Sequence, residues 1–158
     1  MADENSTDVT VETPDYTTFE EVYRVFLGTI DSYYLSQMED DELKENLFGY
    51  LDNALLNFST YISKDFSDLN EEEGHFNVKL TRLEISLLAK GMKLEWVRRS
   101  KHSEELMQKA IGDRDYQAVQ GYQYLDRLRD MDRDLEKEIR TLINRIEYSD
   151  SSLYGDMA

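Results

Sequence analysis

The acidic segment DFSDLNEEEGHF, residues 65–76, holds the densest set of side chains that could bind a metal ion. Its possible ligands are carboxylates, an amide and an imidazole: Asp65, Asp68, Asn70, Glu71, Glu72, Glu73 and His75. A calcium EF-hand requires oxygen ligands at its first, third and fifth positions and glycine at its sixth. Counted from Asp65, the third, fifth and sixth positions are Ser67, Leu69 and Asn70, so the register fails. The pattern is typical of a solvated acidic loop.

Other catalytic and cofactor patterns are incomplete or missing. Glu72 and His75 have the Glu-x-x-His spacing of di-iron bundles, but Gly74 lies between them and the chain offers no second pair. His75 and His102 belong to no triad pattern, and glycine-rich phosphate loops and HExxH are missing. The chain has no cysteine, which excludes disulfides, thiolate catalysis and cysteine-zinc sites. We therefore expect no catalytic, cofactor-binding or metal-binding residue, and no enzyme activity.

The charge distribution bears on partners. The formal net charge is −16, and residues 1–79 carry 19 acids against four bases, whereas residues 80–158 carry 15 acids against 14 bases. DNA binding depends on neutralising phosphates, which an anionic chain does poorly. A negative lining around a channel would instead prevent DNA from adhering. No window approaches the ~18 apolar residues of a membrane span. The acidic N-terminal residues have no basic and no apolar region, so no signal peptide is predicted. We therefore expect no membrane partner.

The elements that position these side chains are predicted to be helices. One proline, seven glycines and abundant Leu, Glu, Lys and Arg favour helix, and β-branched residues are too sparse to suggest a sheet. We predict an all-α protein whose four-helix domain at residues 17–148 ends in one long C-terminal helix. Flexible tails are expected on both sides, an acidic one at 1–16 and a C-terminal one at 149–158.

Apolar periodicity and capping residues locate the predicted helices. They span about residues 18–35, 40–63, 76–102, 103–111 and 116–148, the fourth being a short piece stopped by Gly112. Four of them contain or follow residues with capping chemistry: Thr18 with Glu21, Asp40 or Asp41, Thr81 with Glu84, and Asp113 or Asp115.

The segment FNVKLTRLEISLLAKGMKLEWVRRSKH, residues 76–102, is predicted to be the central core element. Its expected core residues are Leu83, Leu87, Leu88, Met92 and Trp96. Trp96 is either the last core anchor or an interface residue. The carboxylate of Glu84 lies in the apolar band and needs a partner such as Lys90, Arg98 or a neighbouring subunit. The many tyrosines fit both core packing and interfaces, and near pairs such as Tyr33/Tyr34 cannot both be buried by one stripe.

The string LFGYLDNALLNFSTYISKDFSD from Leu47, followed by FNVKLTRLEISLLAKGMKLEWV ending near Trp96, resembles helical head-to-tail connector (adaptor) proteins of tailed bacteriophages. The matched positions are helix-core residues: Phe76, Leu80, Glu84, Leu87, Leu88, Ala89, Met92 and Trp96. The likeness covers about residues 43–148 and includes the long final helix. It implies a structural virion protein that forms a ring, usually dodecameric, beneath the portal, where it extends the DNA channel and offers a docking surface for the tail.

The resemblance also implies partners and sites. They are the portal protein, the tail or a second neck protein, and DNA that passes through the lumen without specific binding. The neck of the virion is the expected location, after assembly in the bacterial host cytoplasm. The C-terminal segment would dock to the portal through Leu153, Tyr154 and Met157. The resemblance and the uneven charge of the two halves together predict acids that line the channel. These are Glu39, Asp40, Asp41, Glu42, Asp65, Asp68, Glu71, Glu72 and Glu73. The alternative is a phage assembly chaperone or scaffold, or another helical interaction protein.

Overall fold

A computed structural model describes residues 14–58 and 64–155, the last five by their backbone alone. The described part of the chain is mainly helical, as predicted, with four substantial helices, of which the C-terminal one is the longest. The elements in chain order are β1 (Thr17–Thr18), α1 (Phe19–Leu27), α2 (Tyr33–Ser36), α3 (Asp40–Phe58), β2 (Leu69–Asn70), β3 (His75–Phe76), α4 (Arg82–Ile111), α5 (Asp113–Ala118) and α6 (Gly121–Gly155).

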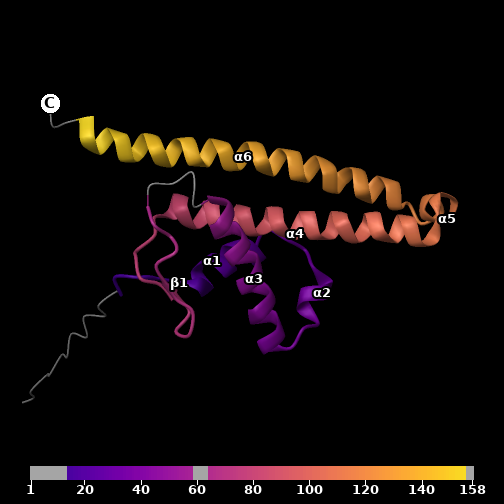
Figure 1. The fold of residues 1–158 in the computed structure, drawn as a ribbon, viewed down its shortest axis with the longest axis horizontal. Coiled ribbons are helices and arrows are strands. Elements are labelled where there is room, and N and C mark those ends of the chain that lie inside the picture. Colours follow the sequence, from indigo (N-terminus) through magenta and orange to yellow (C-terminus); the bar gives the residue numbers. More distant parts are fainter. Residues whose placement is uncertain (1–13, 59–63, 156–158) are drawn as a thin grey trace, which may run out of the picture.

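Helix α4 is the central element, as its apolar sequence predicts. α6 runs antiparallel along it, joined through α5 at one end, and α1 and α3 also pack on it (Figure 1). Leu87, Leu88 and Met92 of α4 are fully buried, which confirms their predicted place in the core. α6 contributes its own apolar stripe, formed by Leu128, Leu135, Ile139, Leu142 and Ile146.

Two further predictions about α4 need correction. Leu83 is 38% exposed, so its assignment to the core is wrong. It lies in the first turn of α4, where other parts of the chain bury Glu84 but leave Leu83 exposed. In the middle of the helix, by contrast, the residues on every side are at least partly buried. Glu84 is buried, and its partner is Lys64, whose Nζ lies 3.0 Å from Glu84 Oε2. Trp96 is partly buried and packs against the core.

Both predicted capping boxes are present. The amide of Glu21 donates to Thr18 Oγ1 at 3.4 Å, and the amide of Thr18 donates to Glu21 Oε2 at 3.0 Å, at the start of α1. Thr81 and Glu84 repeat this arrangement at the start of α4. Each pair satisfies amides that have no partner within the helix.

The first predicted helix is broken, contrary to the expectation of one helix at 18–35. The amide of Gly28 donates to the carbonyl of Arg24, and the Thr29 hydroxyl donates to the carbonyl of Phe26 at 2.7 Å. These bonds satisfy two of the last four carbonyls of α1, those of Arg24 and Phe26. The side chain of Ser32 then caps α2 by accepting the amide of Leu35.

The other helix ends also differ from the prediction. The expected helices at 76–102 and 103–111 form one helix, α4, which begins only at Arg82 because residues 75–76 form β3. The expected last helix is interrupted at Gln120, whose φ is 58°. Asp113 and Asp115 cap nothing, since α5 starts after Gly112 without a side-chain capping bond, and Asp40 and Asp41 lie inside the first turn of α3. α6 continues past Tyr148 to Gly155, because no breaker intervenes.

A small antiparallel sheet, with β3 between β1 and β2, was not expected from the sequence. Thr17 and Leu69 both pair with Phe76. Thr17 is fully buried, and its hydroxyl accepts the amide of Leu80 at 2.8 Å. The sheet holds the β2–β3 hairpin against the start of α1, where the groove described below is formed.

Candidate functional site

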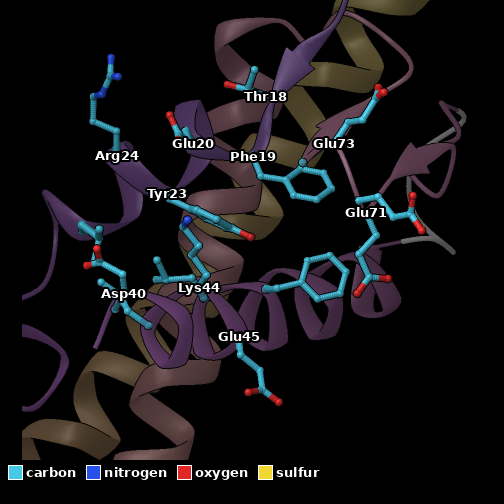
Figure 2. Close-up of a pocket in the computed structure, with 16 residues that line it drawn as sticks. Thr18, Phe19, Glu20, Tyr23, Arg24, Asp40, Lys44, Glu45, Glu71 and Glu73 are labelled. Atoms are coloured by element: carbon cyan, nitrogen blue, oxygen red, sulfur yellow. The ribbon is translucent and has the colours of Figure 1, made fainter. Parts of the chain in front are cut away.

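A groove of about 870 Å³ lies between α1, the first half of α3 and the turn of the β2–β3 hairpin (Figure 2). We call it the acidic groove. Its apolar lining consists of Phe19, Tyr23, Leu27, Leu43, Leu47 and Phe48. Its charged lining consists of Glu20, Asp40, Glu45, Glu71, Glu72 and Glu73, with Arg24 and Lys44 as the two cations. The groove therefore combines an apolar floor with a strong excess of carboxylates.

Phe19 joins the three walls of the acidic groove. Its ring packs edge-on against Phe76 at 5.1 Å and lies 5.7 Å from the ring of Phe48 on α3. Its amide donates to the carbonyl of Gly74 at 2.8 Å. Gly74 has φ 73°, which a glycine adopts without strain, so the hairpin can turn back toward α1 here.

The hydroxyl of Tyr23 shows that the groove disfavours an additional negative charge. Burial raises the pKa of its hydroxyl well above the usual value, and the negative charge of Glu71 raises the pKa further. Figure 2 shows Tyr23 on α1 and Lys44 on α3 facing each other across the groove. Because the carboxylates outnumber the cations, the acidic groove favours a positively charged occupant.

The structure places all nine predicted channel-lining acids at the surface. It brings Asp40 of α3 together with Glu71, Glu72 and Glu73 of the hairpin in the acidic groove. The two acidic segments, which are far apart in the sequence, therefore form one surface. Whether this surface faces a channel stays a prediction.

Several of the loop acids also shape the loop itself. Asp65 accepts the amide of Ser67 at 2.9 Å, and Ser67 lowers the pKa of that carboxyl. Asp68 accepts from the side chain of Asn77 at 2.7 Å. Glu73 Oε2 lies 2.9 Å from Nε2 of His75, and this contact raises the pKa of the imidazole.

A second surface lies where α4, α5 and α6 meet, and we call residues 104–124 the helical tip. It exposes large apolar side chains, which single-helix periodicity did not reveal: Leu106, Met107, Ile111, Val119 and Tyr124. Exposed apolar side chains that gather in one place mark interaction surfaces. Tyr33 and Tyr34 on α2 are also both exposed, at 78% and 71%.

The helical tip is built around Tyr116. This side chain is fully buried, its hydroxyl donates to Glu104 Oε2 at 3.0 Å, and burial raises its pKa to about 12. Its ring packs edge-on against Tyr122, 5.0 Å away, and the Tyr122 hydroxyl donates to Asp113 Oδ1 at 2.7 Å. Gly121 leaves room for the Tyr116 ring, since a Cβ there would lie 2.7 Å from Cδ2. These contacts hold the helical tip in one conformation.

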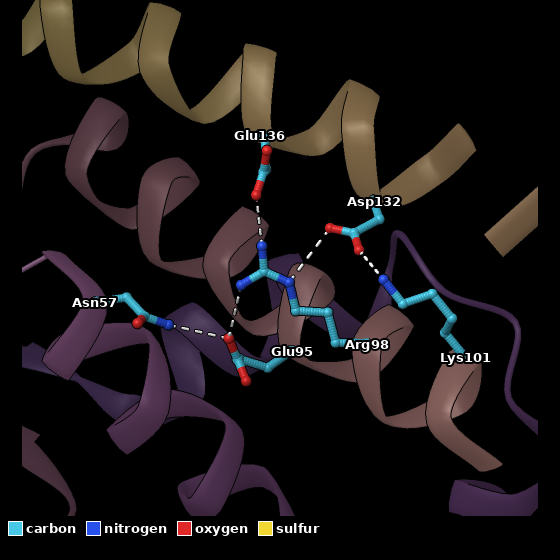
Figure 3. A network of polar contacts seen from close by, with 6 residues as sticks. All are labelled: Asn57, Glu95, Arg98, Lys101, Asp132 and Glu136. Atoms are coloured by element: carbon cyan, nitrogen blue, oxygen red, sulfur yellow. Dashed lines mark hydrogen bonds and ion pairs between the residues drawn. The ribbon is translucent and has the colours of Figure 1, made fainter. Parts of the chain in front are cut away.

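A polar network clamps α4 to α6 between the groove and the tip (Figure 3). Arg98 donates to Asp132 Oδ1 at 3.3 Å and to Glu136 Oε1 at 2.6 Å, and Lys101 also bonds Asp132. Glu95 Oε1 accepts from Asn57 of α3 at 3.0 Å. Burial raises the pKa of Asp132, but Lys101 and Arg98 outweigh it, so the pKa lies below the usual value. Two cations pair with three carboxylates of α4 and α6, and this mutual pairing indicates a structural role.

The predicted portal-docking residues are only partly described. Leu153 and Tyr154 lie within the last turns of α6, and Met157 lies outside the described residues. Over the described ranges, no three His, Cys, Asp or Glu side chains gather closely enough to hold a metal ion. No helix in the described part of the chain has the length and apolar content to cross a bilayer.

Comparison of the chain with protein-family models, with curated proteins and with solved structures gave no significant match.

Proposed function

We propose that the chain is a structural virion protein, a head-to-tail connector that forms a ring under the portal. The observation that carries the proposal is the helical tip, a rigid knob with exposed Leu106, Met107, Ile111, Val119 and Tyr124. Several large apolar side chains exposed in one part of the surface are typical of an interaction site. The resemblance of residues 43–148 to connector proteins supports the same assignment.

The acidic surface suits a wall along which DNA passes. Glu39, Asp41 and Glu42 are exposed, and their carboxylates have no bonding partner among the described residues. In a ring these unneutralised charges would repel phosphates and deny DNA the cation contacts that produce affinity. We assign these three acids to the channel wall.

The C-terminal end of α6 is proposed to dock to the portal through Leu153, Tyr154 and Met157. Deletion of residues 149–158 is expected to abolish portal binding in pull-down and to leave the helical circular dichroism signal nearly unchanged, because Ile146 is the last core residue of α6 among the side chains that the structure describes. A full-length variant with serine at the three apolar positions serves as the matched control for chain length and should also fail to bind. Normal portal binding by both variants would contradict the assignment.

The decisive experiment is multi-angle light scattering of the full chain, alone and with portal protein, together with mass spectrometry of purified particles. A ring on the portal and a stoichiometric presence in finished particles are the expected results. A protein that binds during assembly but is absent from finished particles is instead an assembly chaperone or scaffold, and that result would overturn the connector proposal.

A further inference from the structure

We infer that His75 is a pH-operated latch, which holds the N-terminal segment of residues 14–18 on the β2–β3 hairpin when its imidazole is protonated. The segment loosens when the imidazole becomes neutral. The latch lies beside the acidic groove, because Glu73, one of its parts, also lines that groove. The inference does not depend on the proposed ring, since all of its contacts lie within one chain.

The latch joins two segments that are far apart in the sequence. The ring of Tyr16 stacks on the imidazole of His75, with 4.3 Å between the ring centroids and 29° between the planes. Nε2 of His75 lies 2.9 Å from Glu73 Oε2, and Nδ1 lies 3.2 Å from the carbonyl oxygen of Phe76. The imidazole is therefore held on one face by the N-terminal segment and at both nitrogens by the hairpin.

Both ring nitrogens of His75 face oxygen acceptors, and this geometry favours the protonated ring. A neutral imidazole carries one N–H and can donate to only one of the two oxygens, whereas the imidazolium donates to both. A cation is also attracted to the π face of an aromatic ring, which Tyr16 supplies here. Loss of the proton therefore leaves one acceptor facing a lone pair and weakens the stack at the same time.

The charges around His75 agree with this geometry. The hydrogen bond with Glu73 is the largest cause that raises the pKa of the imidazole. Desolvation opposes the rise, and the Phe76 carbonyl and the negative charge of Glu73 add to it. The other ionisable groups of the segments packed around the imidazole are Asp15 and Tyr16 before β1, Asp68 before β2, Glu71 and Glu72 in the hairpin turn, and Lys79 after β3.

The latch should weaken as the pH rises. The folded-state pKa of His75 lies above its usual value, so its contribution is fully present below the unfolded-state pKa and is lost as pH rises through the folded-state pKa. Two other contacts of the segment do not titrate: the Thr17 amide donates to the Val78 carbonyl at 3.3 Å, and the Leu80 amide donates to Thr17 Oγ1 at 2.8 Å. The segment is therefore expected to loosen without leaving the hairpin.

The latch also changes the charge of the acidic groove. A protonated His75 offsets the charge of Glu73 at the groove, and a neutral His75 leaves that charge uncompensated (Figure 2). The Phe19 amide donates to the Gly74 carbonyl at 2.8 Å, so the hairpin turn beside His75 and the start of α1 are joined as two walls of the groove. The attraction of the groove for cations should therefore rise with pH.

Histidine NMR tests the protonation state of the latch. In full-length His102→Gln protein, His75 is the only histidine, so its imidazole signal is unambiguous in both the folded and the urea-unfolded chain. We expect the folded chain to titrate at higher pH than the unfolded chain, and added Glu73→Gln to lower the folded midpoint. Glu72→Gln, at the neighbouring exposed acid of the turn, is the matched control and should leave the midpoint nearly unchanged. A folded midpoint at or below the unfolded one would overturn the inference.

Amide hydrogen exchange tests whether the proton holds the segment. After division by intrinsic rates, protection of the Thr17 and Leu80 amides should fall about two- to fivefold, relative to the Leu88 amide of α4, between about pH 6 and about pH 8.5. His75→Gln, which is neutral throughout, and Tyr16→Leu, which lacks the π face but keeps the hairpin contacts of His75, should each abolish this fall. A fall of the natural size in either variant, or no fall in the natural chain, would refute the latch.

Discussion

Gly91 leaves no room for a side chain on α4. A Cβ at this position would clash with the ring of Phe58, 2.8 Å from its Cζ, and would lie 3.0 Å from Cβ of Ala54. Gly91→Ala should therefore lower the free energy of unfolding by ~1–3 kcal/mol, the usual cost of overpacking a core. Gly49→Ala is the matched control, because nothing lies within 4 Å of its Cβ position, and it should stabilise α3 by ~0.5–1 kcal/mol. Urea unfolding measured by circular dichroism checks both, and shifts of the same sign would contradict the packing.

Glu84 performs two tasks with one carboxylate. Its Oε2 accepts the amide of Thr81 at 2.6 Å and pairs with Lys64 at 3.0 Å, and its side chain is only 5% exposed. Removing one member of a fully buried pair costs ~3–5 kcal/mol, but Lys64 is a third exposed, so we expect Glu84→Ala to cost ~2–3 kcal/mol. Glu84→Gln should lose less in the same urea experiment, because the amide oxygen still caps Thr81. Equal losses would show that the cap contributes nothing.

At the scale of elements, the sequence predicts those helix ends that depend on residues close to one another in the chain. Thr81 and Glu84 are three residues apart, so their capping box can be predicted from them alone, although the predicted helix began too early, at residue 76. The break at Gln120 cannot be predicted in this way, because apolar spacing continues through it from Val119 to Tyr122 and its positive φ is uncommon for a residue other than glycine. The sheet was missed because its strands are two residues long and depend on contacts between Thr17 and Phe76.

The candidate site also combines features that the local sequence reveals with features that depend on contacts between distant residues. Five of the six groove acids are visible in the sequence as two charge clusters, at residues 39–45 and 71–73, and the sixth is Glu20 on α1. Their union in one groove depends on Phe19 contacting both Phe48 and Phe76, which no local pattern reveals. The helical tip likewise requires the turn of the chain at α5, since its exposed apolar side chains come from α4, from Val119 just after α5 and from α6.

The clamp between α4 and α6 should respond to acid through Asp132. Lys101 and Arg98 lower the folded-state pKa of Asp132 below its usual value, so its contribution is present above the unfolded pKa and is lost as pH falls through the folded pKa. Asp132→Asn should lower the free energy of unfolding by ~1–2 kcal/mol at pH 7 and by progressively less below pH ~4, because the natural chain then loses the same charge.

Asp126→Asn is the matched control on α6. The Asp126 side chain is 71% exposed and lies 3.3 Å from Arg129, so its loss should change the unfolding free energy by no more than ~0.5 kcal/mol at either pH. Urea titrations of the natural chain and the two variants at several pH values give the comparison. A pH-independent effect of Asp132→Asn would mean that its charge does not stabilise the clamp.

For the whole molecule, the uneven charge decides how stability responds to salt. Two effects oppose each other: salt relieves repulsion among the 19 acids and four bases of residues 1–79, and it weakens the exposed ion pairs of α6. Each exposed pair contributes only ~0–1 kcal/mol, whereas six carboxylate residues line one groove, where salt screens their mutual repulsion over a Debye length of ~10 Å at 0.1 M. The relief of repulsion should dominate.

Raising NaCl from low salt to roughly 0.3 M should therefore increase the free energy of unfolding, by ~1 kcal/mol, in urea titrations monitored by circular dichroism. Replacing Glu45, Glu71 and Glu72 of the groove by glutamine should stabilise the chain at low salt and remove much of the salt response, because these exposed acids then no longer repel the rest of the lining. The same number of substitutions at Asp126, Asp130 and Asp134, which lie beside arginines or lysine on α6, should leave the response in place. If the α6 substitutions abolish the salt response and the groove substitutions do not, the repulsion is located outside the acidic groove.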